Sequence, residues 1–314
     1  MSLVVTVQKE FTRYGALIMI VTKNLTKYYD KHLAVDHINF HVKKGEIFGF
    51  LGPNGAGKTT TVRMLSCLTK ISEGEAFVNG YSLLTDKVGV KRSIGVVQDV
   101  ANLFGDLTVK QNLKFMAELY HIDKKRVDEV IKQFDLPANK KFNKLSFGFR
   151  KRAVLAAAVL HNPPILFLDE PTVGLDVRAS RSIQKLIVEL NKEGHTIFLT
   201  THNMAVAEKL SDRIAIINKG KIVALGTPQE LKNMFTKVVK IEVMVDKPKK
   251  EFLEEKELQR FHPHAQGSTI TFSAKHFQDF LDTFYPIAKK HGINVKSITS
   301  SGANIEEVFL EVTK

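Results

Sequence analysis

Apolar residues occur in short runs that alternate with amphipathic stretches as far as about residue 235. A short apolar run between turn residues is typical of a strand buried on both faces, and apolar residues three or four apart are typical of a helix. Their alternation predicts an α/β fold with a mostly parallel sheet. The predicted strands are 47–51, 165–168, 196–200, 213–218 and 221–226, and the predicted helices are 59–68, 179–193 and 204–210.

Two parts of this first region depart from that alternation. Strand-like segments at 20–25 and 34–42, and a hairpin signal at Asn79-Gly80, predict a small antiparallel β lobe. Between about 99 and 160 the pattern is helical, with a helix start at Leu107-Thr108, and we predict a helical subdomain there.

The pattern changes after residue 235, where shorter and more charged segments begin. We predict a small α+β domain over 236–314, following a larger domain over 19–235, with residues 1–18 as an N-terminal extension. Within the small domain we predict strands at 238–245, 268–272 and 293–299, a loop or short helix at 246–257, and a helix at 276–291.

Composition predicts a protein without a membrane span. The longest apolar run, 153–160, is far shorter than the ~18–20 residues that a helix needs to cross a bilayer. The first residues place no basic segment ahead of apolar ones, so we expect no signal peptide. The single cysteine, Cys67, excludes an internal disulfide and fits a reducing compartment. Any transmembrane pathway is therefore expected in a separate chain.

The net charge of +13 lies almost entirely in the first 235 residues, because the remainder holds 12 Lys/Arg and 11 Asp/Glu. A basic surface suits an anionic membrane leaflet or nucleic acid, or is simply a solvated surface. We favour a solvated basic surface, since the sequence has no zinc-ligand spacing, RNA-binding aromatic motif or helix-turn-helix pattern. We expect no specific nucleic-acid partner.

Residues 52–59 read GPNGAGKT, the phosphate-binding loop pattern (Walker A), between a predicted strand and a predicted helix. Glycines let the backbone N–H groups curl around phosphate oxygens, and the helix N-terminus adds partial positive charge. Lys58 would reach the β- and γ-phosphates, and the Thr59 hydroxyl would ligate Mg²⁺. We predict nucleoside triphosphate binding by Gly52, Pro53, Asn54, Gly55, Ala56, Gly57, Lys58, Thr59 and Thr60.

A second motif, ILFLDE at 165–170, is an apolar strand that ends in two carboxylates (Walker B). Asp169 is predicted to hold Mg²⁺ through water, and Glu170 to orient the attacking water. Ligands of open α/β sheets lie outside the carboxyl ends of the strands, so both motifs should converge on one crevice.

With these motifs the chain, over about Met19 to Met234, resembles the nucleotide-binding subunit of an ABC transporter. Residues 145–149 read LSFGF where the family signature reads LSGGQ. Ser146 and Gly148 match the signature, whereas Phe147 and Phe149 depart from it. The resemblance implies that Ser146 and Gly148 contact the γ-phosphate held by the opposite subunit of a head-to-tail dimer.

The same resemblance assigns four further residues and the cofactors ATP and Mg²⁺. It implies that Gln98 contacts Mg²⁺ and couples to the membrane subunit, and that Asp176 crosses the dimer interface. It implies that His202 touches the γ-phosphate and that Tyr29, next to Tyr28, stacks on adenine. Stacking on an aromatic ring discriminates poorly between bases, so the residues themselves do not exclude GTP as the nucleotide. Glu170, His202 and Lys58 are the predicted catalytic residues.

The C-terminal segment order and its NIEEVFLEVT ending resemble the drug-resistance-type (daunorubicin exporter-like) export ATPases. The resemblance implies an ATPase, peripheral at the cytoplasmic face of the membrane, that drives export through separate permease subunits. Its partner would be a second ATP-binding subunit, the same or different. One alternative is a non-transport ABC ATPase acting on nucleic acid or ribosomes, which would need two cassettes or a long coiled-coil insertion. Another is a nucleotide-dependent regulatory module that binds ATP but hardly hydrolyses it.

Overall fold

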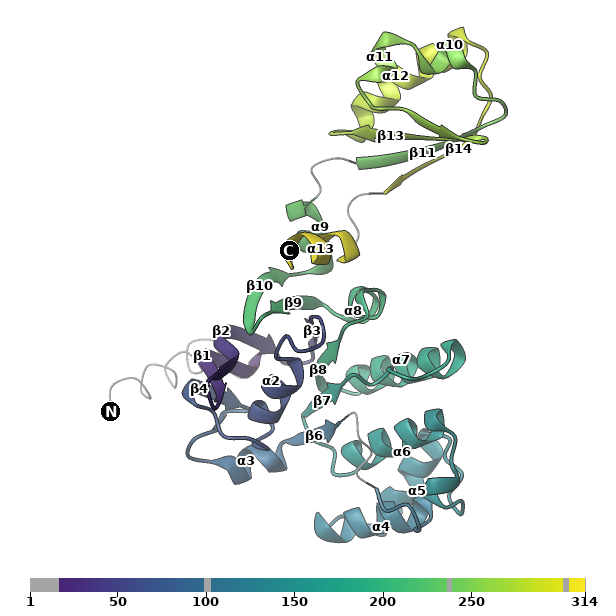
Figure 1. Cartoon of the computed structure of the whole chain (residues 1–314). Helices are drawn as coiled ribbons and strands as arrows, with labels where there is room; N and C mark the ends of the chain where they lie inside the picture. The colour runs from purple at the N-terminus through teal and green to yellow at the C-terminus, as the bar shows by residue number, and fades with distance from the viewer. Residues whose placement is uncertain (1–16, 99–102, 236–238, 302–304, 314) are drawn as a thin grey trace. The chain divides into compact units, whose positions relative to one another are not determined.

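The computed structural model describes residues 17–98, 103–235, 239–301 and 305–313. The chain divides into two compact units, Met1–Thr227 and Pro228–Lys314 (Figure 1). The division precedes the predicted boundary at 235/236 because α9 (Pro228–Phe235) packs against α13 (Ile305–Val312), near the end of the chain. Most of the predicted N-terminal extension, 1–18, lies outside the described residues.

The first unit is built on a six-stranded sheet with the order β10-β9-β3-β8-β7-β6. Strands β9, β3, β8, β7 and β6 are parallel, and only β10 is antiparallel to its neighbour. The predicted α/β fold with a mostly parallel sheet is therefore confirmed. The strands are β3 (Ile47–Leu51), β6 (Ile94–Val97), β7 (Ile165–Asp169), β8 (Thr196–Thr201), β9 (Arg213–Asn218) and β10 (Lys221–Gly226).

The two faces of this sheet belong to different cores, which explains its continuous apolar strands. Phe48, Phe50 and Phe198 belong to one of these cores and pack against Phe40, and Phe167 packs against Phe198, with ring centroids 5.3–5.8 Å apart. The other face of the sheet packs against helices α6, α7 and α8. The residues of strands β3, β7 and β8 are all buried, so alternation of polar and apolar residues is absent from them.

The predicted antiparallel lobe is a four-stranded sheet with the order β2-β1-β4-β5. Asn79 and Gly80 both have positive φ, 49° and 81°, as the two-residue hairpin turn between β4 and β5 requires. The strands are β1 (Ile18–Tyr29), β2 (His32–Lys43), β4 (Glu73–Val78) and β5 (Tyr81–Ser82).

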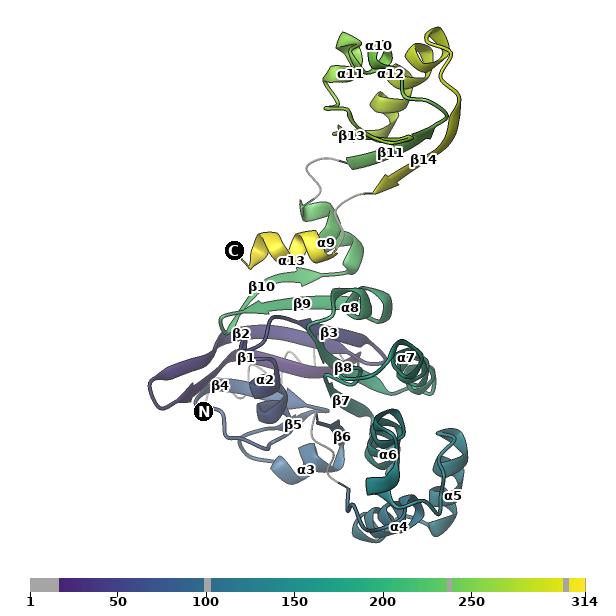
Figure 2. The same cartoon turned by 45° about the vertical axis from the view of Figure 1, so that its right-hand side comes forward.

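The helices of the first unit fall into two groups. Helices α4, α5 and α6 lie together, as both views show (Figure 2), and form the predicted helical subdomain. Thr108 begins α4 with a reciprocal capping box to Gln111. The subdomain contains α4 (Val109–Leu119), α5 (Lys124–Gln133), a 3₁₀ turn (Phe142–Lys144) and α6 (Phe147–Val159); the remaining helices are α2 (Lys58–Leu65), α3 (Lys87–Arg92), α7 (Val177–Lys192) and α8 (Met204–Leu210).

The second unit contains an antiparallel sheet with the order β12-β13-β11-β14. With its helices it forms a split β-α-β-β-α-β arrangement around a core of phenylalanines. The predicted charge-dense loop contains two short helices, and β12 was not predicted. The elements are β11 (Val239–Val245), α10 (Lys250–Leu253), α11 (Lys256–Gln259), β12 (His264–Gln266), β13 (Thr269–Ala274), α12 (Phe277–Lys290) and β14 (Val295–Ser301).

Candidate functional site

A cavity of about 480 Å³ opens where the phosphate-binding loop meets the carboxyl ends of β7 and β8. The two predicted motifs therefore converge, as the topology of a parallel sheet requires. The cavity is lined by Tyr29, His32, Ala34, Asn54, Gly55, Gly57, Lys58, Thr59, Thr60, Asp169, Glu170, Val173 and His202.

The loop between β3 and α2 depends on glycine at particular positions. Gly55 and Gly57 have φ of 80° and 110°, in the left-handed region that side chains disfavour. A methyl group at Gly57 would lie 2.6 Å from the carbonyl oxygen of Ala34, and one at Gly52 would lie 2.5 Å from that of Ile217. The close approach of neighbouring strands thus fixes the loop around the N-terminus of α2, an anion-binding geometry.

Lys58 lies inside this loop and is only 6% exposed. Its Nζ donates hydrogen bonds to the carbonyl oxygens of Gly52, at 2.8 Å, and Pro53, at 3.1 Å. The same Nζ lies 3.3 Å from Oε1 of Glu170. The loop lysine and the second carboxylate of the other motif therefore form an ion pair across the cavity.

Glu170 is held in an unusual geometry. Its φ of 49° is left-handed, and its N–H donates to Oγ1 of Thr200 at 3.1 Å. Oε1 lies 3.0 Å from Nδ1 of His202, while Oε2 is buried and has no hydrogen-bond partner among the described residues. Asp169 accepts a hydrogen bond from the Thr200 hydroxyl. One oxygen of Glu170 is thus held by His202 and Lys58, and the other is buried without a partner among the described residues.

Half of the predicted nucleotide-binding residues line this cavity, and Tyr29 lines it whereas Tyr28 does not. Gly52, Pro53 and Ala56 belong to the loop but do not line the cavity. Gln98 follows β6, one residue beyond the pair formed by Val97 and Leu168, and also does not line it.

Sequence reasoning missed His32 and Thr200. His32 begins β2 after the short turn that follows Tyr29, and Thr200 is the parallel-sheet partner of Asp169. The short turn after Tyr29 could have shown that His32 lies next to Tyr29 at the cavity.

Ser146, Gly148 and Asp176 do not line the cavity in this chain. The Ser146 hydroxyl caps α6 by accepting from the N–H of Phe149 at 3.5 Å, and Asp176 caps α7 by accepting from the N–H of Ala179 at 2.8 Å. A methyl group at Gly148 would lie 3.1 Å from Cβ of Ala179, so the starts of the two helices touch. These residues form a second cluster on the same unit.

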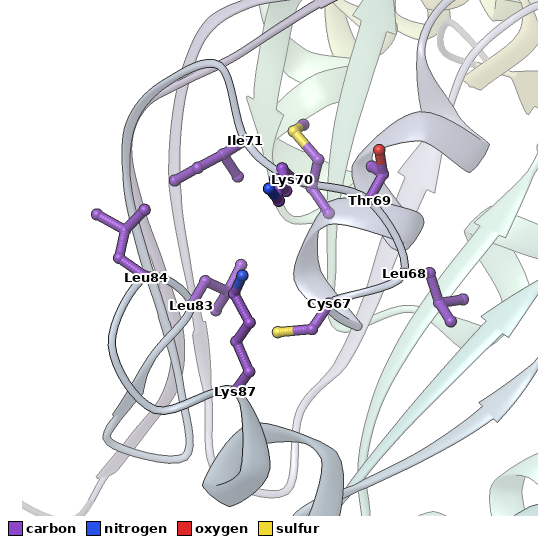
Figure 3. Close-up of a pocket in the computed structure, with 9 residues that line it drawn as sticks. Cys67, Leu68, Thr69, Lys70, Ile71, Leu83, Leu84 and Lys87 are labelled. Carbon is purple, nitrogen blue, oxygen red and sulfur yellow. The ribbon is translucent and has the colours of Figure 1, made fainter.

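A smaller cavity of about 290 Å³ lies beyond the other end of α2 (Figure 3). Its lining includes Cys67, Leu83 and Lys87 and none of the predicted site residues. Burial raises the pKa of the Cys67 thiol, which favours the inert protonated form. No cluster of three metal-binding side chains occurs in the described part of the chain.

Comparison with known proteins extends this picture. The ABC transporter family model matches residues 35–173. The linearmycin resistance ATP-binding protein LnrL of Bacillus subtilis is 34% identical over 305 residues, which cover 94% of this chain and 98% of LnrL. The chain belongs to the ABC transporter family. It is an ATP-binding subunit of that family, and it hydrolyses ATP.

Other relatives agree with this assignment. The bacitracin transport ATP-binding protein BcrA of Bacillus licheniformis is 35% identical over 300 residues, covering 94% of this chain and 97% of BcrA. Among solved structures, the dimeric bacterial ABC transporter cassette MJ0796 is 31% identical, with a TM-score of 0.62, over 67% of this chain and 98% of that one. These comparisons do not favour a nucleic-acid or ribosomal ATPase.

Proposed function

We propose that this subunit binds and hydrolyses MgATP as one half of a head-to-tail dimer, and thereby drives export of an antibiotic-like compound through separate membrane subunits. The observation that carries the proposal is the meeting of Lys58, Glu170 and His202 in the cavity of the phosphate-binding loop. A buried cation, a carboxylate and an imidazole together match what phosphoryl transfer to water requires.

ATP enters this cavity with its phosphates at the N-terminus of α2. The Lys58 ammonium exchanges its contacts with the carbonyls of Gly52 and Pro53 for contacts with the β- and γ-phosphates. Tyr29, 41% exposed beside the loop, offers a ring face for adenine. The phosphates thus fix the position of the nucleotide, and the base contributes stacking.

Mg²⁺ suits the oxygen donors gathered at the same place. Thr59 and Asp169 both line the cavity, and Gln98 lies at the end of the strand next to Asp169. Oxygen ligands of this kind, together with phosphates and waters, are what Mg²⁺ prefers. When bound, the ion neutralises phosphate charge.

Glu170 acts on the water that attacks the γ-phosphate. Its Oε1 lies 3.0 Å from Nδ1 of His202, which fixes the direction of the carboxylate, and this carboxylate is the base that accepts a proton from the water. The ion pair with Lys58 breaks as the lysine moves to phosphate, which leaves Glu170 free for this role.

The second half of each site comes from another chain. Ser146, Gly148 and Asp176 gather at the touching ends of α6 and α7 and do not line their own cavity, so in a head-to-tail pair they would face the partner's nucleotide. The dimeric state named for MJ0796 supports this arrangement.

The membrane subunits are the remaining partners, and they place the protein at the cytoplasmic face. In the described part of the chain, no helix combines the length and apolar character that a bilayer crossing requires. The helical subdomain exposes Phe104, Phe115 and Leu119, an apolar surface that suits a partner helix. Relatives named for linearmycin resistance and bacitracin transport support an antibiotic as the exported compound.

The test is the variant Glu170→Gln. It keeps the size of the side chain and removes its charge, so MgATP turnover should fall by about 10²–10⁴-fold while ATP affinity survives. Trapped ATP should then hold two chains together, and light scattering should detect a dimer in MgATP but a monomer in MgADP. Near-normal turnover would exclude Glu170 as the catalytic carboxylate, and a strict monomer in saturating MgATP would contradict the dimer.

A further inference from the structure

Phe147 replaces the glycine that usually follows the signature serine, and its ring has a specific contact. The residue opens α6 directly after the capping Ser146, and its side chain is 46% exposed. Nζ of Lys151, one turn further along the helix, lies 5.7 Å from the ring centroid, within the range of a cation–π contact. The ring also contacts a residue outside the helix.

That other contact is the backbone of Gly174. A methyl group built on Gly174 would lie 2.9 Å from Cε1 of Phe147 and 3.4 Å from Cζ, so the ring occupies the space in which a side chain would stand. Gly174 has φ of 75°, a conformation that favours glycine. It lies in the loop between Glu170 and the capping residue Asp176.

Two hydrogen-bonded turns connect Glu170 to the segment around Gly174. The N–H of Val173 donates to the carbonyl oxygen of Glu170 at 3.3 Å, and the N–H of Leu175 donates to that of Thr172 at 3.4 Å. Val173 itself lines the ATP cavity. A displacement of the Phe147 ring would therefore reach Glu170 through a short and ordered path.

We propose that Phe147 is a positioning residue that couples the two ATP sites of the dimer. The inference rests on the proposed head-to-tail dimer, in which Ser146 of one chain faces the nucleotide of the other chain. When Ser146 and Gly148 engage that nucleotide, Phe147 presses on Gly174 and sets the loop that carries Glu170 of its own chain. ATP bound at one site thus prepares the other site for hydrolysis.

Coupling between two equal sites gives cooperative kinetics, with a Hill coefficient above 1 and at most 2. In the full chain we expect Phe147→Ala to lower the Hill coefficient for MgATP hydrolysis to about 1, because the path between the sites is interrupted. Phe147→Tyr keeps the ring on Gly174 and should retain cooperativity. A role limited to packing would change the unfolding temperature but not the Hill coefficient.

Tyr81 provides a matched control. It is 39% exposed and also packs on a glycine, since a methyl group at Gly89 would meet its ring, but it lies in the β lobe away from the ATP cavity. Tyr81→Ala should retain the wild-type Hill coefficient.

A double-mutant cycle tests the contact itself. Gly174→Ala places a methyl group against the ring and should lower turnover, whereas in the Phe147→Ala background the same change should cost less. The two effects should differ by about threefold or more, as expected for residues in contact. Additive effects would overturn the contact's role.

The outcomes separate this inference from the proposed function. Unchanged cooperativity in Phe147→Ala, or a wild-type Hill coefficient of 1, would overturn the coupling even if Glu170→Gln dimerises in MgATP. A Glu170→Gln variant that never dimerises would instead remove the dimer itself, and the coupling with it.

Discussion

At the scale of single residues, the cavity is organised around the charged groups of Lys58 and Glu170. Lys58 is paired with Glu170 and with two loop carbonyls, and Glu170 is shared with His202. A buried ammonium needs such partners, since desolvation of an unpaired charge is costly. Phosphate oxygens offer stronger acceptors, so we propose that nucleotide binding releases Glu170 from Lys58.

Lys58→Ala removes the cation from that exchange. ATP affinity should fall about 10–100-fold, because a hydrogen bond to a charged group contributes about 1.5–3 kcal/mol. Equilibrium binding of a fluorescent ATP analogue measures the loss. Lys87→Ala, which removes a lysine from the smaller cavity instead, is the matched control and should bind ATP as the wild type does. Equal affinity in both variants would remove Lys58 from the site.

The same scale shows what the sequence could predict. Gly55, Gly57 and Lys58 were predictable because one continuous loop holds them, and the backbone geometry that cradles phosphate requires glycine at fixed spacing. Thr200 was not, because its contact with Asp169 depends on the register of β8 against β7. No local pattern encodes a register between strands that far apart in sequence.

At the scale of elements, His161 makes contacts that connect helix α6 with helix α4 and strand β6. It follows α6, stacks on Tyr120 at the end of α4 with ring centroids 4.3 Å apart, and its Nε2 lies 3.0 Å from the carbonyl oxygen of Ile94 in β6. Its buried Nδ1 has no partner among the described residues. Burial lowers the pKa of His161, so the folded state favours the neutral ring.

This predicts a pH-dependent stability. As the pH falls through about 6.5, the ordinary pKa of a histidine side chain, the unfolded state binds a proton at this position before the folded state does, so stability is lost down to the lowered pKa. His161→Phe keeps the stack without the titration. The free energy of unfolding of this variant should be about 1 kcal/mol below that of the wild type at pH 8, because the hydrogen bond is lost. This difference should shrink towards pH 5, where the wild type is destabilised by protonation in the unfolded state. Urea unfolding at both pH values measures this, and a constant gap would contradict it.

Elements with a chemical start signal were the ones that the sequence predicted well. Thr108 and Gln111 mark the start of α4, and Asn79-Gly80 marks a hairpin. Strand β12 and helix α3 were missed because each is short and lacks a periodic apolar pattern, so tertiary pairing decides them.

At the scale of the whole molecule, each compact unit has its own apolar core and the chemistry lies in the first. All residues that line the ATP cavity precede Thr227, and the phenylalanine core of the second unit is built from residues after it. The sequence predicts a second domain from a change of pattern after residue 235. It did not predict that α9 belongs with the second, because that depends on its packing against α13.

A chain truncated after Thr227 should therefore still bind ATP, with affinity within about twofold of the full chain, the range of a small change in binding free energy. Isothermal titration calorimetry with MgATP measures it, and circular dichroism checks that the truncated chain is folded. Loss of binding in a folded truncation would mean that the second unit completes the site.

Tyr29, at the mouth of the ATP cavity, has a practical consequence because the chain contains no tryptophan. A tryptophan introduced there would be the sole indole emitter in the protein, placed where adenine is expected to stack. Stacking against a base quenches indole emission, so filling and emptying of the cavity could be followed in real time without any label.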